Sequence, residues 1–123
     1  MTSTSTVSSS TLVHRRVAGQ SAEIHPPRAT ISAVLITKNE ASQITPCLRS
    51  LTDWVDEIVV LDSGSTDATL DIARQYGAKV FVREDWEGFG IQRQRAQDLA
   101  TSDYIMAIDA DERISEQLRE AIE

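Results

Sequence analysis

The feature that most constrains the fold is a short apolar run near the end of the chain that leads into a cluster of acids. Residues 104–108 read Tyr-Ile-Met-Ala-Ile, and Asp109, Asp111 and Glu112 follow directly. A continuous apolar run of this length is typical of a strand buried on both faces, in a parallel sheet covered by helices. Ligands of such sheets bind beyond the carboxyl ends of the strands. The acids therefore lie where a ligand site is expected.

The spacing of these acids suggests a chemistry. In an extended chain Asp109 and Asp111 point the same way, about 7 Å apart. Two such carboxylates repel each other, and an all-oxygen pair suits a hard cation such as Mg²⁺ or Mn²⁺. Acids are also ordinary residues of turns and of the first turn of a helix, so the same residues could simply begin a helix near residue 113. Both interpretations stay open on this segment alone.

Strand and helix patterns alternate along residues 31–123, which predicts an α/β fold with a doubly wound, mostly parallel sheet. Thr45 and Thr66 are the expected N-caps of the first two helices, and Gly77 is the expected end of the second. Cys47 occupies an apolar helical position and is expected in the core. The expected strands are residues 31–36, 57–61, 79–82 and 104–108, of which 79–82 reads as an edge.

Polar clusters follow three of these strands. Thr37, Lys38, Asn39 and Glu40 follow the first, Asp62 follows the second, and the acids at residues 109–112 follow the fourth. If the first and fourth strands are neighbours, with the second on the other flank of the first, all three clusters meet at a switch point where a nucleotide can lie.

Asp62 has two interpretations on its own residues. Its carboxylate can accept the ring N–H of uracil, thymine or guanine, whereas cytosine offers an acceptor there. An Asp before Ser-Gly-Ser is also a common turn former. Farther along, residues 84–90 hold Trp86, Phe89 and two glycines, a composition that fits a loop able to move or to shape a pocket.

Length and composition set outer limits. With 123 residues the chain has one domain at most. Residues 1–30 are rich in Ser and Thr and are expected to be a disordered tail, which leaves residues 31–123 as the folded part. A net charge of −7 argues against nucleic acid as a partner. No run is long enough to span a bilayer or resembles a secretory signal, so a cytoplasmic location is expected.

The single cysteine and the two histidines, His14 and His25, exclude other chemistries. One cysteine allows neither an internal disulfide nor a zinc cluster. Both histidines lie in the expected tail, so Ser-His-Asp and Cys-His catalysis have no credible base.

Three motifs together resemble a known family. Thr37-Lys38-Asn39-Glu40, Val60-Leu61-Asp62-Ser63-Gly64-Ser65-Thr66-Asp67 and Ala107-Ile108-Asp109-Ala110-Asp111-Glu112, in this order, resemble the family-two inverting glycosyltransferases of GT-A fold. The resemblance covers residues 31–123. Trp86-Glu87-Gly88-Phe89 and Gln92-Arg93 are similar to the branch that includes lipopolysaccharide core glucosyltransferases.

The resemblance implies a Rossmann-like, nucleotide-binding half of a GT-A domain. The implied reaction is metal-dependent transfer of a sugar, with inversion, from a nucleotide-sugar donor such as a UDP-sugar. The implied acceptor is a glycolipid or polysaccharide of the cell envelope, in lipopolysaccharide biosynthesis, and the implied cofactor is Mg²⁺ or Mn²⁺. Such an enzyme would associate peripherally with the inner face of the membrane.

The resemblance also implies roles for single residues. Thr37, Lys38, Asn39 and Glu40 would contact the nucleotide, Asp62 would recognise the base, and Arg93 would contact the nucleotide side. Asp109 would face the ribose or the metal, and Asp111 would ligate the metal that bridges the diphosphate.

The chain departs from the family pattern at Gln94, where many members have Asn, and at Ser102, where many have Gly. The family's general base and acceptor region come from a later segment than Glu123. We therefore expect a truncated domain that is incomplete for catalysis, with no catalytic base among its residues.

Two other functions remain as alternatives. A non-catalytic module could bind a nucleotide through the same edge. A phosphoacceptor receiver-like domain has similar length and winding, but it needs an acid pair after the first strand and a lysine after a fifth, and neither is found.

Overall fold

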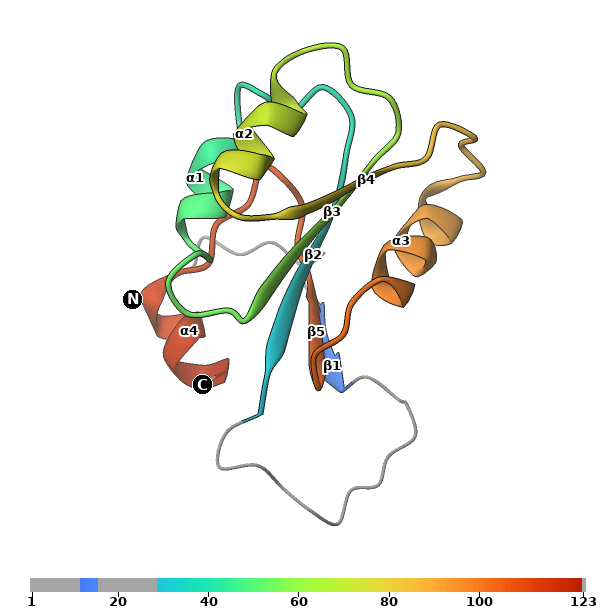
Figure 1. Cartoon of the computed structure of the whole chain (residues 1–123). Coiled ribbons are helices and arrows are strands. Elements are labelled where there is room, and N and C mark those ends of the chain that lie inside the picture. The colour runs from blue at the N-terminus through green and yellow to red at the C-terminus, as the bar shows by residue number, and fades with distance from the viewer. Residues whose placement is uncertain (1–11, 16–28, 123) are drawn as a thin grey trace.

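A twisted five-stranded sheet forms the middle layer of the protein, with helices on both of its faces (Figure 1). This computed structural model describes residues 12–15 and 29–122. The strands lie in the order β1-β5-β2-β3-β4. Neighbouring strands from β5 to β4 are parallel, and β1 is antiparallel to β5. The strands are β1 (Leu12–Arg15), β2 (Ile31–Thr37), β3 (Glu57–Asp62), β4 (Lys79–Val82) and β5 (Tyr104–Ala107).

This order confirms the predicted sheet. The first predicted strand, β2, lies between β5 and β3, and β4 is an edge. The central strands are buried on both faces, as their continuous apolar sequences predict. The parallel register pairs Thr37 with Asp62 and Val34 with Ala107, so three strand ends meet at one edge of the sheet.

Helices on opposite faces divide the core into two parts. In Figure 1, α1 and α2 lie on one side of the sheet and α3 on the other. Alternate residues of one strand point to opposite faces, so Leu35 packs toward α1 and its neighbour Val34 packs toward Ala96 of α3. Cys47 is fully buried in the part of the core between the sheet and α1, as expected. The helices are α1 (Ile44–Arg49), α2 (Thr69–Gln75), α3 (Phe89–Asp98) and α4 (Glu116–Ile122).

Two predicted helix starts are wrong. The helix α1 begins at Ile44 and its N-cap Gln43 makes no side-chain capping bond, so Thr45 is inside the helix. At α2, the Asp67 side chain accepts hydrogen bonds from the backbone N–H and hydroxyl of Thr69. The N-cap of α2 is Ala68, which has no capping side chain, and Asp67, not Thr66, accepts the first backbone N–H of the helix.

Strand β1 differs from the predicted tail. Residues 1–30 were expected to lack structure, yet Leu12–Arg15 pair with β5. Without this pairing, β5 would be an edge strand with open backbone groups, and a short aliphatic segment can fill that edge. The rest of the predicted tail, apart from residues 29 and 30, lies outside the described residues.

Glu57 ties four segments together at the amino-terminal end of the sheet. Its buried carboxylate accepts hydrogen bonds from Ser32 of β2, from Lys79 of β4 at 2.7 Å, and from the backbone N–H of Thr101 at 2.9 Å. Burial alone would raise the pKa of Glu57, but these hydrogen bonds outweigh it and hold the pKa below its ordinary value. The carboxylate is thus stabilised in its charged form.

None of the helices in the described part of the chain is long and apolar enough to cross a membrane.

Candidate functional site

Three loops meet at the carboxyl-terminal edge of the sheet, as the predicted strand order requires. Asn39 connects two of them. Its backbone N–H donates to the Ser65 hydroxyl at 2.7 Å, and its side-chain oxygen accepts from the backbone N–H of Thr66 at 2.8 Å. Asn39 has a positive φ of 55°, a conformation that asparagine tolerates better than most residues. Asn39 therefore holds the loop after β2 against the loop after β3.

Asp62 is fully buried and its carboxylate is used inside the protein. One oxygen accepts from the hydroxyls of Thr37 and Ser65, both at 2.6 Å. The other accepts from the backbone N–H groups of Gly64 at 2.8 Å and Ser65 at 2.6 Å. Burial would raise the pKa of Asp62, but these bonds hold it below its ordinary value.

This geometry matches the turn-forming interpretation of Asp62. Gly64 has a φ of 116°, which favours glycine, and the carboxylate fixes the turn around it. The neighbouring Ser63, not Asp62, lines the cavity described below. Base recognition by Asp62 stays a prediction, and it would require the carboxylate to exchange one of these bonds.

The acids after β5 divide into a structural and an exposed group. Glu112 is buried, accepts from the backbone N–H of Asp109 at 2.8 Å, and donates its own N–H to the Asp109 carbonyl at 3.0 Å. These two bonds shape the turn. Arg93 of α3 pairs with the Asp109 carboxylate at 3.2 Å, which places two predicted site residues together. Asp111 is exposed to solvent.

The pKa of Glu40 responds to the negative charges at this edge. Burial raises the pKa of Glu40, and the negative charges of Asp111, Asp109 and Asp67 raise it further. The loops after β2 and β5 therefore bring carboxylates close enough to disfavour the ionised form of Glu40. Like charges that cannot move apart favour a cation among them.

The carboxylates after β5 suit a cation that also binds water and substrate phosphates. Within residues 12–15 and 29–122, no three Asp, Glu, His or Cys side chains are grouped to hold a metal by themselves. Mg²⁺ and similar ions often take only one or two protein carboxylates and complete their shell with water and substrate phosphates. Asp111, which is exposed, and Asp109, which already pairs with Arg93, meet that requirement.

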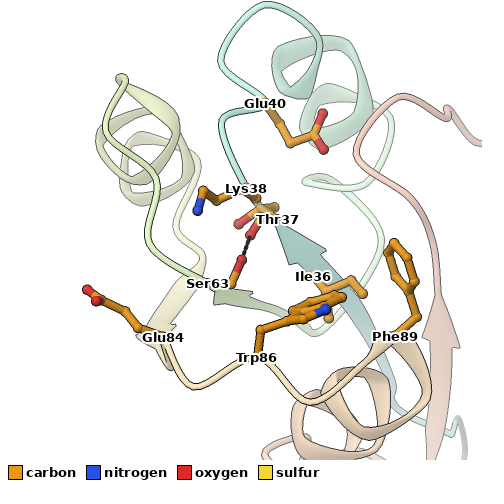
Figure 2. A pocket seen from close by; sticks show the side chains of 8 residues that line it. All are labelled: Ile36, Thr37, Lys38, Glu40, Ser63, Glu84, Trp86 and Phe89. Atoms are coloured by element: carbon orange, nitrogen blue, oxygen red, sulfur yellow. Dashed lines mark hydrogen bonds between the residues drawn. The ribbon is translucent and has the colours of Figure 1, made fainter.

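A cavity of about 410 Å³ opens beside these loops (Figure 2). Its polar side comes from the ends of β2 and β3, where the Ser63 hydroxyl donates to the Thr37 carbonyl at 3.4 Å. In Figure 2, Trp86 and Phe89 lie on the side away from Glu40. The cavity is lined by Ile36, Thr37, Lys38, Glu40, Ser63, Glu84, Trp86 and Phe89.

The predicted site residues divide between the cavity and its surroundings. Thr37, Lys38 and Glu40 line the cavity, Asn39 and Asp62 support its loops, and Arg93 and Asp109 line a smaller hollow that shares Ile36 with it. Sequence reasoning assigned no roles to the lining residues Ser63, Glu84, Trp86 and Phe89. Residues 84–90, which hold Trp86, Phe89 and two glycines, indicate a loop that shapes a pocket, and the structure confirms that indication.

Open α/β proteins bind nucleotides in a crevice beyond the carboxyl ends of their parallel strands, and the cavity lies at that place in this protein. Residues 32–123 match the family model described as Glycosyl transferase family 2. The chain belongs to this family. Membership leaves the receiver-like alternative without support.

Relatives of known sequence agree. The chain is 48% identical over 93 residues to an uncharacterised glycosyltransferase of Rickettsia felis, covering 76% of this chain and 32% of that protein. It is 37% identical over 100 residues to the lipopolysaccharide core biosynthesis glycosyltransferase LpsC of Rhizobium meliloti, covering 78% of this chain and 37% of that protein. The chain thus spans about a third of the length of the curated relatives it matches.

Solved structures agree on the fold. TarS 1-349 of S. aureus superposes with a TM-score of 0.67 at 33% identity, covering 76% of this chain and 31% of that chain. Glucosyl-3-phosphoglycerate synthase of Mycobacterium tuberculosis, in complex with Mn²⁺, UDP and its product, superposes with a TM-score of 0.59 at 36% identity, covering 67% of this chain and 33% of that enzyme. The likeness to these two structures confirms the predicted fold class, a GT-A domain built on a mostly parallel sheet.

Proposed function

We propose that this chain binds the nucleotide-sugar donor of an inverting glycosyltransferase, with a UDP-sugar as donor and Mg²⁺ or Mn²⁺ as cofactor. The observation that carries the proposal is the cavity at the carboxyl-terminal edge, lined by Thr37, Lys38 and Glu40, with the exposed Asp111 and the Arg93–Asp109 ion pair at the same edge. The synthase neighbour binds UDP together with Mn²⁺, which supports the choice of nucleotide and metal.

Asp111 and Asp109 would hold the metal, which would neutralise charge on the diphosphate leaving group. Arg93, beside Asp109, adds a positive charge on the same side and favours phosphate. Thr37, Lys38 and Glu40 would contact the nucleoside from the cavity wall, and Asn39 would keep their loop in place. The domain formed by residues 31–123 would thus serve donor binding.

The acceptor belongs to the same proposal. The likeness to LpsC supports a glycolipid or polysaccharide acceptor of the cell envelope and a role in lipopolysaccharide biosynthesis. A glycolipid acceptor sits in a bilayer while the donor is dissolved in water, so transfer would take place at a membrane surface, on its cytoplasmic side. We place the catalytic base and most acceptor contacts in the parts of the longer relatives that this chain does not span.

The metal ligand provides the test. UDP affinity in saturating Mn²⁺ should fall about 100-fold or more in Asp111→Asn, because losing even an outer partner of a metal costs about 10–100-fold. Glu116→Gln, which removes an exposed acid from the first turn of α4, is the matched control and should bind as the wild type does. Calorimetry on chains whose fold is verified by circular dichroism measures both. Equal affinities for Asp111→Asn and wild type would reject the assigned ligand.

A non-catalytic nucleotide-binding module would pass this test as well. It is separated by turnover, measured as sugar released from UDP-glucose by a protein of the relatives' full length. Binding without any transfer or hydrolysis would identify the module.

A further inference from the structure

Trp86 and Phe89 form an exposed aromatic wall beside the cavity. Trp86 is 46% exposed and Phe89 69% exposed, and their rings meet edge to face with centroids 5.0 Å apart. The other tryptophan, Trp54, is buried, and its indole N–H donates to the Ser50 carbonyl at 2.8 Å. Trp54 thus has a structural role that Trp86 lacks. A large exposed aromatic surface at a cavity marks a ligand contact.

Two arginines, Arg83 and Arg95, contact the loop that carries Trp86, and Arg95 does so on both sides of the tryptophan. Arg95 of α3 is largely buried, and it pairs with the two residues that flank Trp86: with Asp85 at 3.3 Å and with Glu87 at 3.4 Å. It also donates to the backbone carbonyl of Asp85 at 2.9 Å. The indole therefore stands on a loop fixed from both sides. Fixing a contact surface before binding reduces the entropy lost when a ligand binds.

The position of Trp86 and Phe89 indicates which part of a bound nucleotide would lie next to them. The metal-binding carboxylates follow β5, whereas the cavity lies at the ends of β2 and β3, with Trp86 on the loop after β4. Adjacent strands are about 4.8 Å apart, so the ends of β5 and β3 are separated by about 10 Å. A diphosphate at the β5 end would place the ribose over β2 and the base toward Trp86. The sugar, attached beyond the diphosphate, would extend in the other direction.

We propose that the indole face of Trp86 stacks on the nucleobase of the donor nucleotide, and that Arg95 is the positioning residue that holds Trp86 there. This inference rests on the proposed function. Every base has a π face that an aromatic side chain can cover, so Trp86 contributes affinity, while base identity is read by the polar groups of the opposite wall.

The test compares ligands that contain and lack a base. In saturating Mn²⁺, Trp86→Ala should weaken UDP binding about 10-fold, a typical effect of losing one stacked aromatic. Its affinity for inorganic diphosphate should stay unchanged. Trp86→Phe should keep most of the UDP affinity. Ile91→Ala is the matched control, because Ile91 is also 46% exposed and apolar but does not line the cavity, and it should bind UDP as the wild type does.

Fluorescence supplies an independent readout. UDP should quench the emission of the wild type but not that of Trp86→Phe, whose remaining indole, Trp54, is buried. Arg95→Gln should weaken UDP binding several-fold without changing diphosphate binding, and Arg95→Lys should restore part of the loss. Equal loss for UDP and diphosphate in Arg95→Gln would overturn the positioning role.

The outcomes separate this inference from the function on which it rests. A folded wild type that binds no UDP would overturn both. If the wild type binds UDP, but Trp86→Ala binds it equally tightly and UDP does not quench the tryptophan emission of the wild type, only the stacking proposal is overturned. Unchanged UDP binding with weakened UDP-glucose binding in Trp86→Ala would assign the indole to the sugar ring and overturn its contact with the base.

Discussion

Two carboxylates at opposite ends of the sheet, Glu57 and Glu40, have pKa values shifted in opposite directions. At the amino-terminal end, Glu57 is surrounded by donors from three other segments, and its pKa is lowered despite burial. At the carboxyl-terminal edge, Glu40 is near Asp111 and Asp109, and burial and these charges both raise its pKa. The donors around Glu57 stabilise its charge within the protein, whereas the acidic neighbours of Glu40 oppose its charge. A cation bound near Glu40 would reverse that effect.

The largest expected effect on stability comes from removing the Glu57 carboxylate. Glu57→Ala leaves the Ser32 hydroxyl and the Thr101 N–H without their acceptor, and the free energy of unfolding should fall by about 2–3 kcal/mol. Urea denaturation followed by circular dichroism measures the change. Asp71→Ala, which removes an exposed acid from α2, is the control and should change stability by less than about 0.5 kcal/mol. If Glu57→Ala were as stable as this control, Glu57 would not stabilise the amino-terminal end of the sheet.

Asp62 lies at the carboxyl-terminal edge but resembles Glu57 in being saturated by donors. Asp62→Asn should lower the free energy of unfolding by about 1–2 kcal/mol, because an amide cannot accept all four bonds. Its UDP affinity should fall with and without metal. If UDP affinity fell while stability stayed at the wild-type value, Asp62 would be a base-recognition residue and not a turn former.

The pH dependence of stability sharpens the contrast. The pKa of Glu57 is lower in the folded protein than its usual value of 4.5, so its stabilisation is complete above that value. The contribution is lost as the pH falls through the lowered pKa of the folded state. The difference in urea midpoint between the wild type and Glu57→Gln should therefore be largest near pH 7 and should shrink below about pH 4.5. A difference that grows on acidification would contradict the sign of the shift.

The smallest expected effect concerns Glu40 itself. Asp111→Asn removes one of the charges that raise the pKa of Glu40, so this pKa should fall, although the part caused by burial should remain. Carbon-detected NMR titration of the Glu40 carboxyl measures it. Asp71→Asn is the control, because Asp71 is not among the charges that raise the pKa of Glu40. An unchanged Glu40 pKa in Asp111→Asn would show that the two loops do not share one electrostatic cluster.

Much of the fold could be predicted because its signals are local. Each central strand is a continuous apolar run, and polar residues end β2, β3 and β5. These polar ends meet at one edge only if β2 lies between the other two strands, and the structure meets that condition. The pairing of residues 12–15 with β5 could not be predicted in the same way. It depends on an open strand edge far along the chain, not on a strong pattern in the segment.

The candidate site was predictable at the level of loops but not of side chains. Thr37 and Asp62 are 25 residues apart, and only the parallel register brings them into one hydrogen bond. The role of Trp86 depends on Arg95, on the next helix, which fixes the flanking acids. Such long-range partners decide whether a polar residue faces a ligand or a turn, and no local pattern contains them.

The central claim is a donor site completed by a metal, and calorimetric titration with UDP, in the presence of Mn²⁺ and of EDTA, tests it most directly. The account predicts that UDP binds in the micromolar to submillimolar range common for substrates. It also predicts that EDTA abolishes most of this affinity, and that CDP and ADP bind more weakly. A chain verified as folded that binds UDP equally with and without metal, or does not bind it, would contradict the account.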